Sequence, residues 1–152
     1  MNKKFELIKN DSIEINGHKL YRLRALIDFS DVKAGDLGGY VEHENNLSQM
    51  NDCWIYDNAR VFGNACVYDS ARVYDDACVF GNAKVYDNAR VFKNARVYGN
   101  ACIFDDARVY DNANVFGNAR IRSIATIFEH AHVYANVTIS GKVNICNNTH
   151  IF

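Results

Sequence analysis

The sequence predicts an all-β solenoid in which three short strands make one coil. Two periods lead to this fold class. An aliphatic residue occupies every sixth position from Ile55 to Ile151 without a break. Glycine recurs every 18 residues, at Gly63, Gly81, Gly99 and Gly117. A short fixed period is typical of repeat architectures, and three hexads per 18 residues indicate a three-sided prism.

Each six-residue repeat predicts one flat side and one corner. In the hexad that begins at Val61, the aliphatic residue is position one and Ala65 is position five. Alternation along Ala65, Cys66, Val67 and Tyr68 indicates a short strand, and the Asp, Asn and Gly pairs between strands favour tight corners. Alanine and valine then fill a narrow core, and Cys53, also at position five, is expected to point inward. Continued backward, the same phase puts Leu37 at position one and Val41 at position five.

The segment before the repeat predicts a β-hairpin over residues 4–27. Asn16-Gly17 is a strong signal for a tight turn between antiparallel strands. On the return strand Tyr21, Leu23 and Ala25 alternate with arginines, whereas Leu20 is out of phase. We expect this hairpin to cap a solenoid of about six coils. The predicted organisation is therefore a cap over residues 1–36 and a solenoid over residues 37–152.

Two resemblances sharpen this prediction. The repeat V/I-x-x-N-A-x resembles the hexapeptide repeat of left-handed parallel β-helices, which is typified by bacterial acyltransferases. This resemblance implies a single-stranded left-handed parallel β-helix with three hexapeptides per coil. Residues 28–59, DFSDVKAGDLGGYVEHENNLSQMNDCWIYDNA, resemble the YdcK-type transferases, and related hexapeptide proteins occur on phages and prophages.

Position two of the repeat is aromatic on every side of the predicted prism. The most informative side is the Arg/aromatic face, which consists of Arg72, Tyr74, Arg90, Phe92, Arg108 and Tyr110. Aromatic rings one coil apart can stack on one another, and exposed apolar stripes also mark interaction surfaces. Stacked rings beside guanidinium groups could also bind a nucleotide or another phosphorylated ligand. Against this, we expect the corner aspartates beside these arginines to neutralise the face.

Composition restricts the possible partners. Seventeen basic and eighteen acidic side chains give a net charge of −1, which disfavours nucleic acid and anionic membranes as partners. No apolar run is long enough to span a bilayer, and no secretion signal is evident. Five cysteines without a CxxC pair predict a reduced, cytoplasmic protein, and the scattered histidines lack the spacing of a metal site.

The sequence favours binding over catalysis. Hexapeptide acyltransferases place a catalytic histidine at a subunit interface, commonly beside loops that interrupt the coils. Here no loop interrupts residues 49–152, and no spacing supplies a partner that would orient His130 or His132 as a base. We therefore assign no catalytic residue, metal or cofactor, and acyl-CoA applies only to the acyltransferase alternative.

The resulting functional prediction is a non-catalytic binding or assembly scaffold, related to phage proteins, that presents rigid faces to a protein partner. An acyl-CoA-dependent acyltransferase and a module that sequesters a small nucleotide are the alternatives. We also expect a homo-oligomer, a dimer or a trimer, because an open solenoid end exposes unpaired strand edges. The residues expected to mediate self-association are His132, Tyr134, Ile151 and Phe152.

Overall fold

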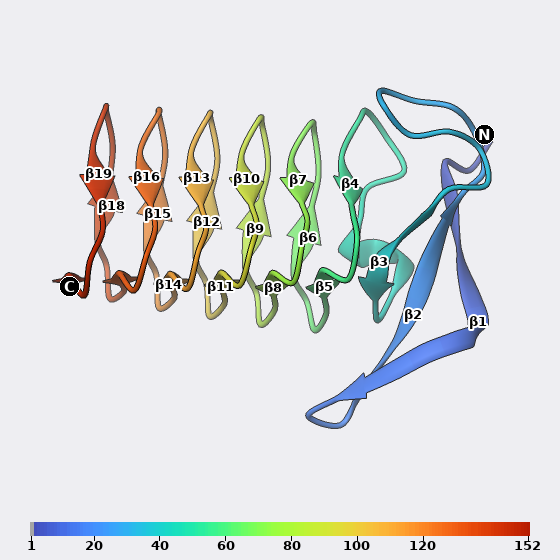
Figure 1. Ribbon diagram of the computed structural model, residues 1–152, viewed down its shortest axis with the longest axis horizontal. Coiled ribbons are helices and arrows are strands. Elements are labelled where there is room, and N and C mark those ends of the chain that lie inside the picture. Colours follow the sequence, from blue (N-terminus) through green and yellow to red (C-terminus); the bar gives the residue numbers. More distant parts are fainter. Residues whose placement is uncertain (1) are drawn as a thin grey trace.

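A computed structural model describes residues 2–152, and it confirms an all-β parallel solenoid of about six coils (Figure 1). The chain begins with a hairpin of β1 (Phe5–Ile15) and β2 (His18–Ala25), followed by β3 (Leu37–Val41) and the short 3₁₀ helix η1 (Glu44–Asn46). Seventeen two-residue strands, β4 to β20, follow. Within residues 2–152, no helix has the length and apolar character needed to cross a membrane.

The short strands form three parallel sheets, one on each side of the prism. The first sheet contains β4 (Trp54–Ile55), β7 (Arg72–Val73), β10 (Arg90–Val91), β13 (Arg108–Val109), β16 (Thr126–Ile127) and β19 (Asn144–Ile145). The second contains β5 (Arg60–Val61), β8 (Cys78–Val79), β11 (Arg96–Val97), β14 (Asn114–Val115), β17 (His132–Val133) and β20 (His150–Ile151), and is continued by β3, β2 and β1. The third contains β6 (Cys66–Val67), β9 (Lys84–Val85), β12 (Cys102–Ile103), β15 (Arg120–Ile121) and β18 (Thr138–Ile139).

The alanines and aliphatic residues of the repeat form the core, as the sequence predicts. Position one, such as Val97, and position five, such as Ala95, are both fully buried. Each strand pairs with the strand one coil away, so that Val97 lies between Val79 and Val115. Every coil therefore stacks the same small side chains at the same height, which leaves no room for a larger residue in the narrow interior.

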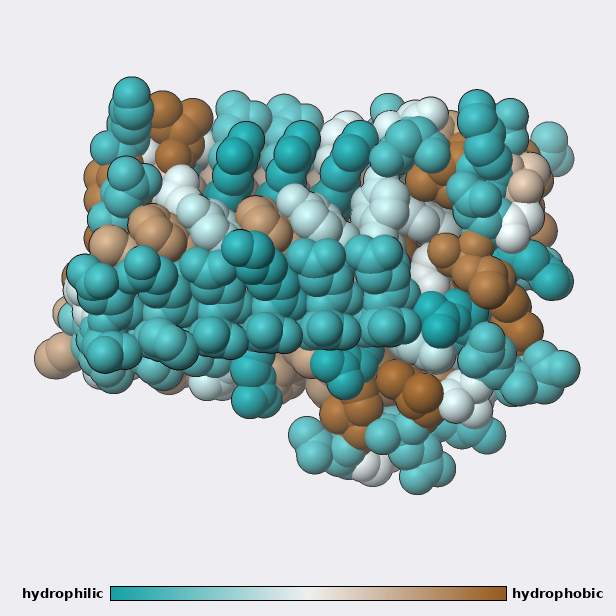
Figure 2. Space-filling view, in the orientation of Figure 1, coloured by the Kyte–Doolittle hydropathy of each residue, from teal (hydrophilic) through white to brown (hydrophobic). Residues whose placement is uncertain are grey.

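The corners have the backbone geometry that their Asp, Asn and Gly residues favour. Corner residues are left-handed in each column, with φ of 55° at Asp87 and 66° at Gly99. Corner carboxylates also join successive coils, since Oδ2 of Asp87 accepts the backbone N–H of Asp105 at 3.1 Å. Beside the glycine column, the asparagine side chains form a ladder in which Asn64 donates to Asn82 at 3.2 Å. Figure 2 shows a continuous hydrophilic band along the coils.

The glycine column provides a test of corner packing. A Cβ at Gly99 would lie 2.9 Å from the Gly117 nitrogen, whereas a Cβ at Gly141 meets no atom within 4 Å, and both residues have positive φ. We expect Gly99→Ala to lower the free energy of unfolding by about 2–3 kcal/mol, because it adds overpacking to backbone strain. Gly141→Ala should cost about 1 kcal/mol from the strain alone. Urea denaturation measures both variants, and equal losses of unfolding free energy in Gly99→Ala and Gly141→Ala would contradict this account.

The first coil departs from the predicted phase. Val41 pairs with Val61 and Leu47 with Val67, separations of 20 residues, whereas Ile55 and Val73 are 18 apart. Two extra residues therefore lie in the corner between Leu47 and Trp54. Val41 occupies position one rather than the predicted position five, and Leu37 is 58% exposed rather than in the core. A backward extension of the period is wrong here because it assumes coils of constant length.

The predicted N-terminal hairpin is present, and its return strand has the predicted side-chain phase. β1 pairs with β2 and β2 with β3, both antiparallel, and β3 then pairs in parallel with β5. The β2–β3 ladder shifts register between Arg22 and Arg24. Leu20 is fully buried in a second cluster with Tyr40 and Phe62, separate from the main core that holds Leu23 and Ala25, so it is out of phase with them, as the sequence predicts. Leu20 and Leu23 are three positions apart, so they lie on opposite faces of β2, and each face packs against its own cluster.

Candidate functional site

The predicted Arg/aromatic face lies on the first sheet. Arg90 pairs in register with Arg72 on one side and Arg108 on the other. The rings of Tyr74, Phe92 and Tyr110 stack in parallel, with centroids 4.7 Å apart at both steps. The structure therefore brings all six predicted residues onto one surface. Their aromatic rings are half-buried by mutual stacking, which confirms the ladder but reduces the exposed apolar area expected from the sequence.

The corner carboxylates beside this face bond to the backbone rather than to the arginines. Asp69 and Asp87 use Oδ2 to accept backbone N–H groups of the next coil. Over residues 2–152, Arg72 forms an ion pair with Asp31 at 3.9 Å, but Arg90 and Arg108 form no ion pair. Both of these arginines are exposed. Arg90 and Arg108 are therefore exposed without an ion pair among the described residues, while the nearby aspartates keep their negative charge and are held at the corners by these backbone bonds.

A loop that sequence reasoning did not assign to the site covers one end of this face. Residues 26–36 connect β2 to β3, and Phe29 packs edge-on against Trp54 with ring centroids 5.3 Å apart. This contact brings Asp31 beside Tyr56, whose O–H donates to Asp31 Oδ1 at 2.8 Å. Ser30 Oγ accepts a bond from Arg72 at 3.1 Å. The signal in the sequence was the Asp-Phe-Ser-Asp run in the segment that resembles YdcK-type proteins.

A concavity forms where the loop meets the face, and we call it the Tyr74 hollow. It has a volume of about 210 Å³ and is lined by Asp31, Tyr56, Asp57, Arg72, Tyr74 and Arg90. Three of the six predicted ligand residues therefore line it, Arg72, Tyr74 and Arg90. Phe92, Arg108 and Tyr110 continue the same surface beyond its rim.

The Tyr56 phenol is held in its protonated form. Burial, followed by its hydrogen bond to Asp31, raises the pKa of Tyr56 well above its ordinary value of 10.0. A phenol that stays protonated in the folded protein but ionises in the unfolded chain stabilises the fold below pH 10, and this stabilisation is lost as the pH rises above that value.

This linkage predicts the behaviour of Tyr56→Phe. At neutral pH the variant should lose about 1 kcal/mol of unfolding free energy with the hydrogen bond to Asp31. Above pH 10 the difference from the wild-type protein should shrink, because only the wild-type chain has a Tyr56 to ionise on unfolding. Urea denaturation at several pH values measures both free energies. If the difference in unfolding free energy between the two proteins stays constant up to about pH 11, the pKa of Tyr56 is not raised by folding.

The residues predicted to mediate self-association lie together at the C-terminal end of the second sheet. His132 stacks on His150 with ring centroids 4.5 Å apart, and Tyr134 stacks on Phe152 at 5.3 Å. Ile151 is half-buried and Phe152 is 77% exposed. Burial and the neighbouring histidines lower the pKa of His132. The remaining rings of this sheet, from Phe62 to Tyr134, form a continuous parallel stack.

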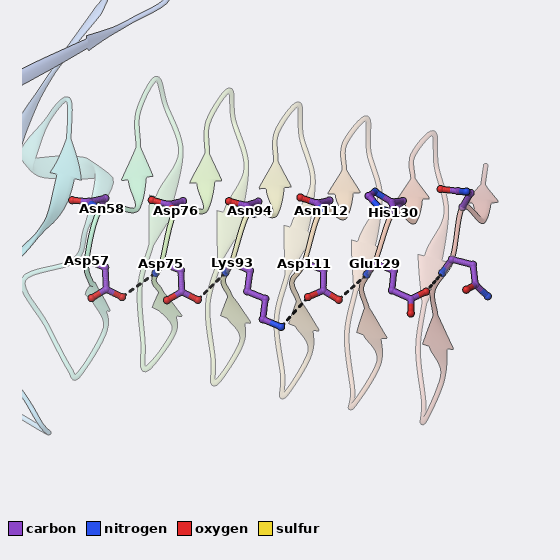
Figure 3. A pocket seen from close by; sticks show the side chains of 12 residues that line it. Asp57, Asn58, Asp75, Asp76, Lys93, Asn94, Asp111, Asn112, Glu129 and His130 are labelled. Atoms are coloured by element: carbon purple, nitrogen blue, oxygen red, sulfur yellow. Dashed lines mark hydrogen bonds and ion pairs between the residues drawn. The ribbon is translucent and has the colours of Figure 1, made fainter.

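A second concavity follows one corner of the prism (Figure 3). It has a volume of about 820 Å³ and runs beside the column Asp57, Asp75, Lys93, Asp111 and Glu129. All four carboxylates accept the backbone N–H of the next corner, and Lys93 binds Asp111 at 2.9 Å. The bonds join neighbouring coils, so the column stabilises the corner.

One histidine has an orienting carboxylate that the sequence did not reveal. His18 Nδ1 lies 3.0 Å from Glu42, which also accepts the backbone N–H of Gly63. Burial acts to raise the pKa of Glu42, but the bonds from His18 and Gly63 outweigh it and lower the pKa. The first coil places Glu42 beside the hairpin. Over residues 2–152, no group of three or more His, Cys, Asp or Glu side chains is arranged to hold a metal ion.

Comparison with known proteins agrees with this architecture. The family described as the YdcK beta solenoid repeat matches residues 55–70 and 83–99. These two stretches are thus similar to YdcK-type β-solenoid repeats. It is also similar to a protein named "Uncharacterized acetyltransferase YdcK" from Escherichia coli (strain K12), with 49% identity over 47 residues. The alignment covers 30% of this chain and 14% of that protein.

The YdcK-type match overlaps the Arg/aromatic face in part. The matched residues include Tyr56, which closes one side of the Tyr74 hollow, and Arg90 and Phe92 of β10 and its following corner. Arg72 and Tyr74 lie between the two matched stretches. The loop of residues 26–36 lies outside the matched stretches, as does Arg72, whereas Tyr56, which the loop also contacts, lies inside the first of them.

Proposed function

We propose that this protein is a non-catalytic binding module whose Arg/aromatic face recognises an acidic segment of a protein partner. The observation that carries the proposal is the pair of exposed arginines, Arg90 and Arg108, which form no ion pair among residues 2–152. Arginine binds carboxylates in bidentate geometry, and charge-assisted hydrogen bonds of this kind are among the strongest at protein surfaces.

Rigidity supports recognition by this face. The arginines project from strands that are fixed by main-chain pairing on both sides, and the stacked rings of Tyr74, Phe92 and Tyr110 lie between them. A surface that is already ordered loses little conformational entropy when a partner binds. Tyrosine and arginine are also enriched among residues that dominate binding energies at interfaces.

The test compares two double variants in a quantitative capture experiment. Arg90→Gln with Arg108→Gln removes two exposed charges from the Arg/aromatic face. Arg96→Gln with Arg120→Gln removes two exposed charges from the other two sheets. We expect the wild-type protein and the second variant to retain the same proteins from a cell lysate, and the first variant to lose them. Capture should also weaken as salt is raised.

Two results would overturn the proposal. The first is a set of captured proteins that both double variants lose equally, since this would indicate a non-specific charge effect. The second is capture that neither variant changes. Thermal melting of both variants checks that the fold is retained, because exposed arginines contribute little to stability.

Self-association is the second part of the proposal. It is supported by the exposed ring of Phe152 beside Tyr134 at the end of the second sheet, since exposed aromatic surface favours contact between copies. Sedimentation velocity of the wild-type protein and Phe152→Ser provides the measurement. We expect a dimer or trimer that shifts toward monomer in the variant, and a monomer in both cases would contradict this part. The five cysteines are free, which suits a reducing compartment such as the cytoplasm.

A second candidate function is acyl transfer from acyl-CoA, which the name of the Escherichia coli relative suggests. His18 would be the base to test, because Glu42 orients its ring. Incubation with acetyl-CoA and a panel of amine and hydroxyl acceptors measures release of free coenzyme A. Turnover that is lost in His18→Gln would favour this candidate over the binding module.

A further inference from the structure

The aromatic ladder of the first sheet is interrupted at one step. Tyr74, Phe92, Tyr110 and Phe128 are parallel within 8° at each step. Tyr56 instead meets Tyr74 edge-on, with an interplanar angle of 83° and centroids 6.2 Å apart. By contrast, the ladder of the second sheet is parallel from its first pair, Phe62 and Phe80, at 3°. The ring plane of Tyr74 that faces Tyr56 therefore has no parallel neighbour.

The loop of residues 26–36 explains this interruption. The Tyr56 O–H is bound to Asp31 at 2.8 Å, which holds the ring across the ladder rather than along it. The same loop binds Arg72 through Ser30 and, at 3.9 Å, through Asp31. The loop itself is fixed by Phe29 on the buried ring of Trp54. The Tyr74 hollow therefore depends on the loop, which turns the Tyr56 ring out of the parallel stack and binds the Arg72 side chain.

The charges in the Tyr74 hollow favour a ligand with one anionic group. Asp31 is engaged by Tyr56 and Arg72, and Asp57 Oδ2 accepts the backbone N–H of Asp75 at 3.1 Å. Arg90 lines the hollow without an ion pair among the residues described. The two arginines and two aspartates of the lining balance formally, and Arg90 is the guanidinium group that an added anionic group can pair with.

We propose that the Tyr74 hollow binds a small molecule with one planar aromatic ring and one anionic group. The ligand ring packs within the hollow against Tyr74 and the turned ring of Tyr56, and the anionic group pairs with Arg90. Contact with aromatic side chains and pairing with a guanidinium group together recognise such a molecule. A volume of about 210 Å³ accommodates a single ring system with its anionic group and excludes a dinucleotide. This site is separate from the protein-binding role proposed above, although it shares Arg90.

Isothermal titration of the intact protein with two groups of probes tests the site and distinguishes the sources of the ligand. One group consists of nucleoside monophosphates, and the other of aromatic carboxylates such as 4-hydroxybenzoate. Ribose 5-phosphate lacks the ring, and adenosine lacks the anionic group. We expect at least one probe of the two groups to bind, and both of these control molecules to bind more than about tenfold more weakly.

Matched variants decide whether any binding belongs to the Tyr74 hollow. We expect Arg90→Gln and Tyr74→Leu each to weaken the bound probe by about tenfold or more. Arg96→Gln and Tyr98→Leu make the same changes on the second sheet and should leave the affinity unchanged. The proposal is overturned if no probe of either group binds, if the control molecules bind as well as the probe, or if Arg90→Gln and Tyr74→Leu have no effect.

Arg108→Gln separates this inference from the proposed protein-binding function. Arg108 lies on the Arg/aromatic face but outside the lining of the Tyr74 hollow. We expect this variant to keep its affinity for the probe while its capture of protein partners falls. Binding of the probe without any protein capture would refute the proposed function and support the small-molecule site. Protein capture without binding of any probe would support the proposed function and refute the small-molecule site.

Discussion

Replacing Trp54 with alanine is expected to lower the free energy of unfolding by about 3–5 kcal/mol, the usual cost of removing a large buried aromatic side chain. Trp54 is 1% exposed, and it contacts the rings of Phe5 and Phe29 edge-on, with centroids 6.3 Å and 5.3 Å away. It thus fills the space between the hairpin, the loop of residues 26–36 and the first coil. Alanine would leave a cavity that three separate segments would have to close.

Far-UV circular dichroism during urea denaturation measures the loss, and Trp54→Phe serves as the control, with an expected cost of about half as much because it keeps a ring in the cavity. Hydrogen exchange gives a sharper readout. Each coil contacts only the coils next to it in the stack. Amides of β2, β3 and the first coil should therefore lose protection from hydrogen exchange, whereas those of β13 and β16 should not. An alanine variant as stable as the wild-type protein, or a uniform loss of protection, would contradict this role.

The solenoid was predictable from sequence because one physical requirement repeats in every coil. Position five lies in a narrow triangular interior that favours a small side chain, and the corner requires a left-handed backbone, so the choice of residues is restricted at both places. These requirements hold at Ala95 and at Gly99 alike. Side chains along each short strand point alternately into the core and toward solvent, and this alternation depends only on neighbouring residues. The position of Cys53 in the core was therefore also predicted correctly.

The first coil was not predictable in the same way. His43 and Gln49 interrupt the aliphatic period, but an interruption alone does not show how many residues are inserted. The structure assigns position one to Val41 and Leu47, and frees Gln49 to accept the backbone N–H groups of Lys4 and Phe5. These contacts join residues more than 40 positions apart. Such pairings depend on how the hairpin folds back, which no short sequence period records.

The candidate site was predictable only where it lies within the repeat. The 18-residue period brought Arg72, Arg90 and Arg108 onto one face, because residues one coil apart lie in register. The Tyr74 hollow also depends on Asp31, which lies in a loop outside the repeat. The sequence also did not show that the corner aspartates form no ion pair with Arg90 and Arg108, because a carboxylate near an unpaired backbone N–H can bind that group instead of a side chain.

Replacing Lys4 with methionine is expected to lower the free energy of unfolding by about 2–3 kcal/mol, although the change removes a buried charge. Lys4 is 2% exposed, and its Nζ lies 2.8 Å from the Cys53 carbonyl oxygen and 3.1 Å from that of Asn51. It also lies 3.4 Å from the Met50 carbonyl oxygen. The two extra residues of the first coil thus create a ring of carbonyl oxygens that closes around one amino group.

Methionine keeps the length of the side chain but has no hydrogen to donate, so carbonyl groups in this corner would lose their partner. Substituting one member of a buried polar cluster usually costs more than removing the whole cluster, because the remaining groups stay desolvated without a bond. Lys3→Met is the matched control, since Lys3 binds Glu44 at 2.9 Å on the surface, where both side chains are about half exposed, at 57% and 48%. Its loss should be below about 1 kcal/mol. Equal unfolding free energies for the two variants would show that Lys4 does not join the hairpin to the first coil, and the extra corner residues would then have no role in holding that lysine.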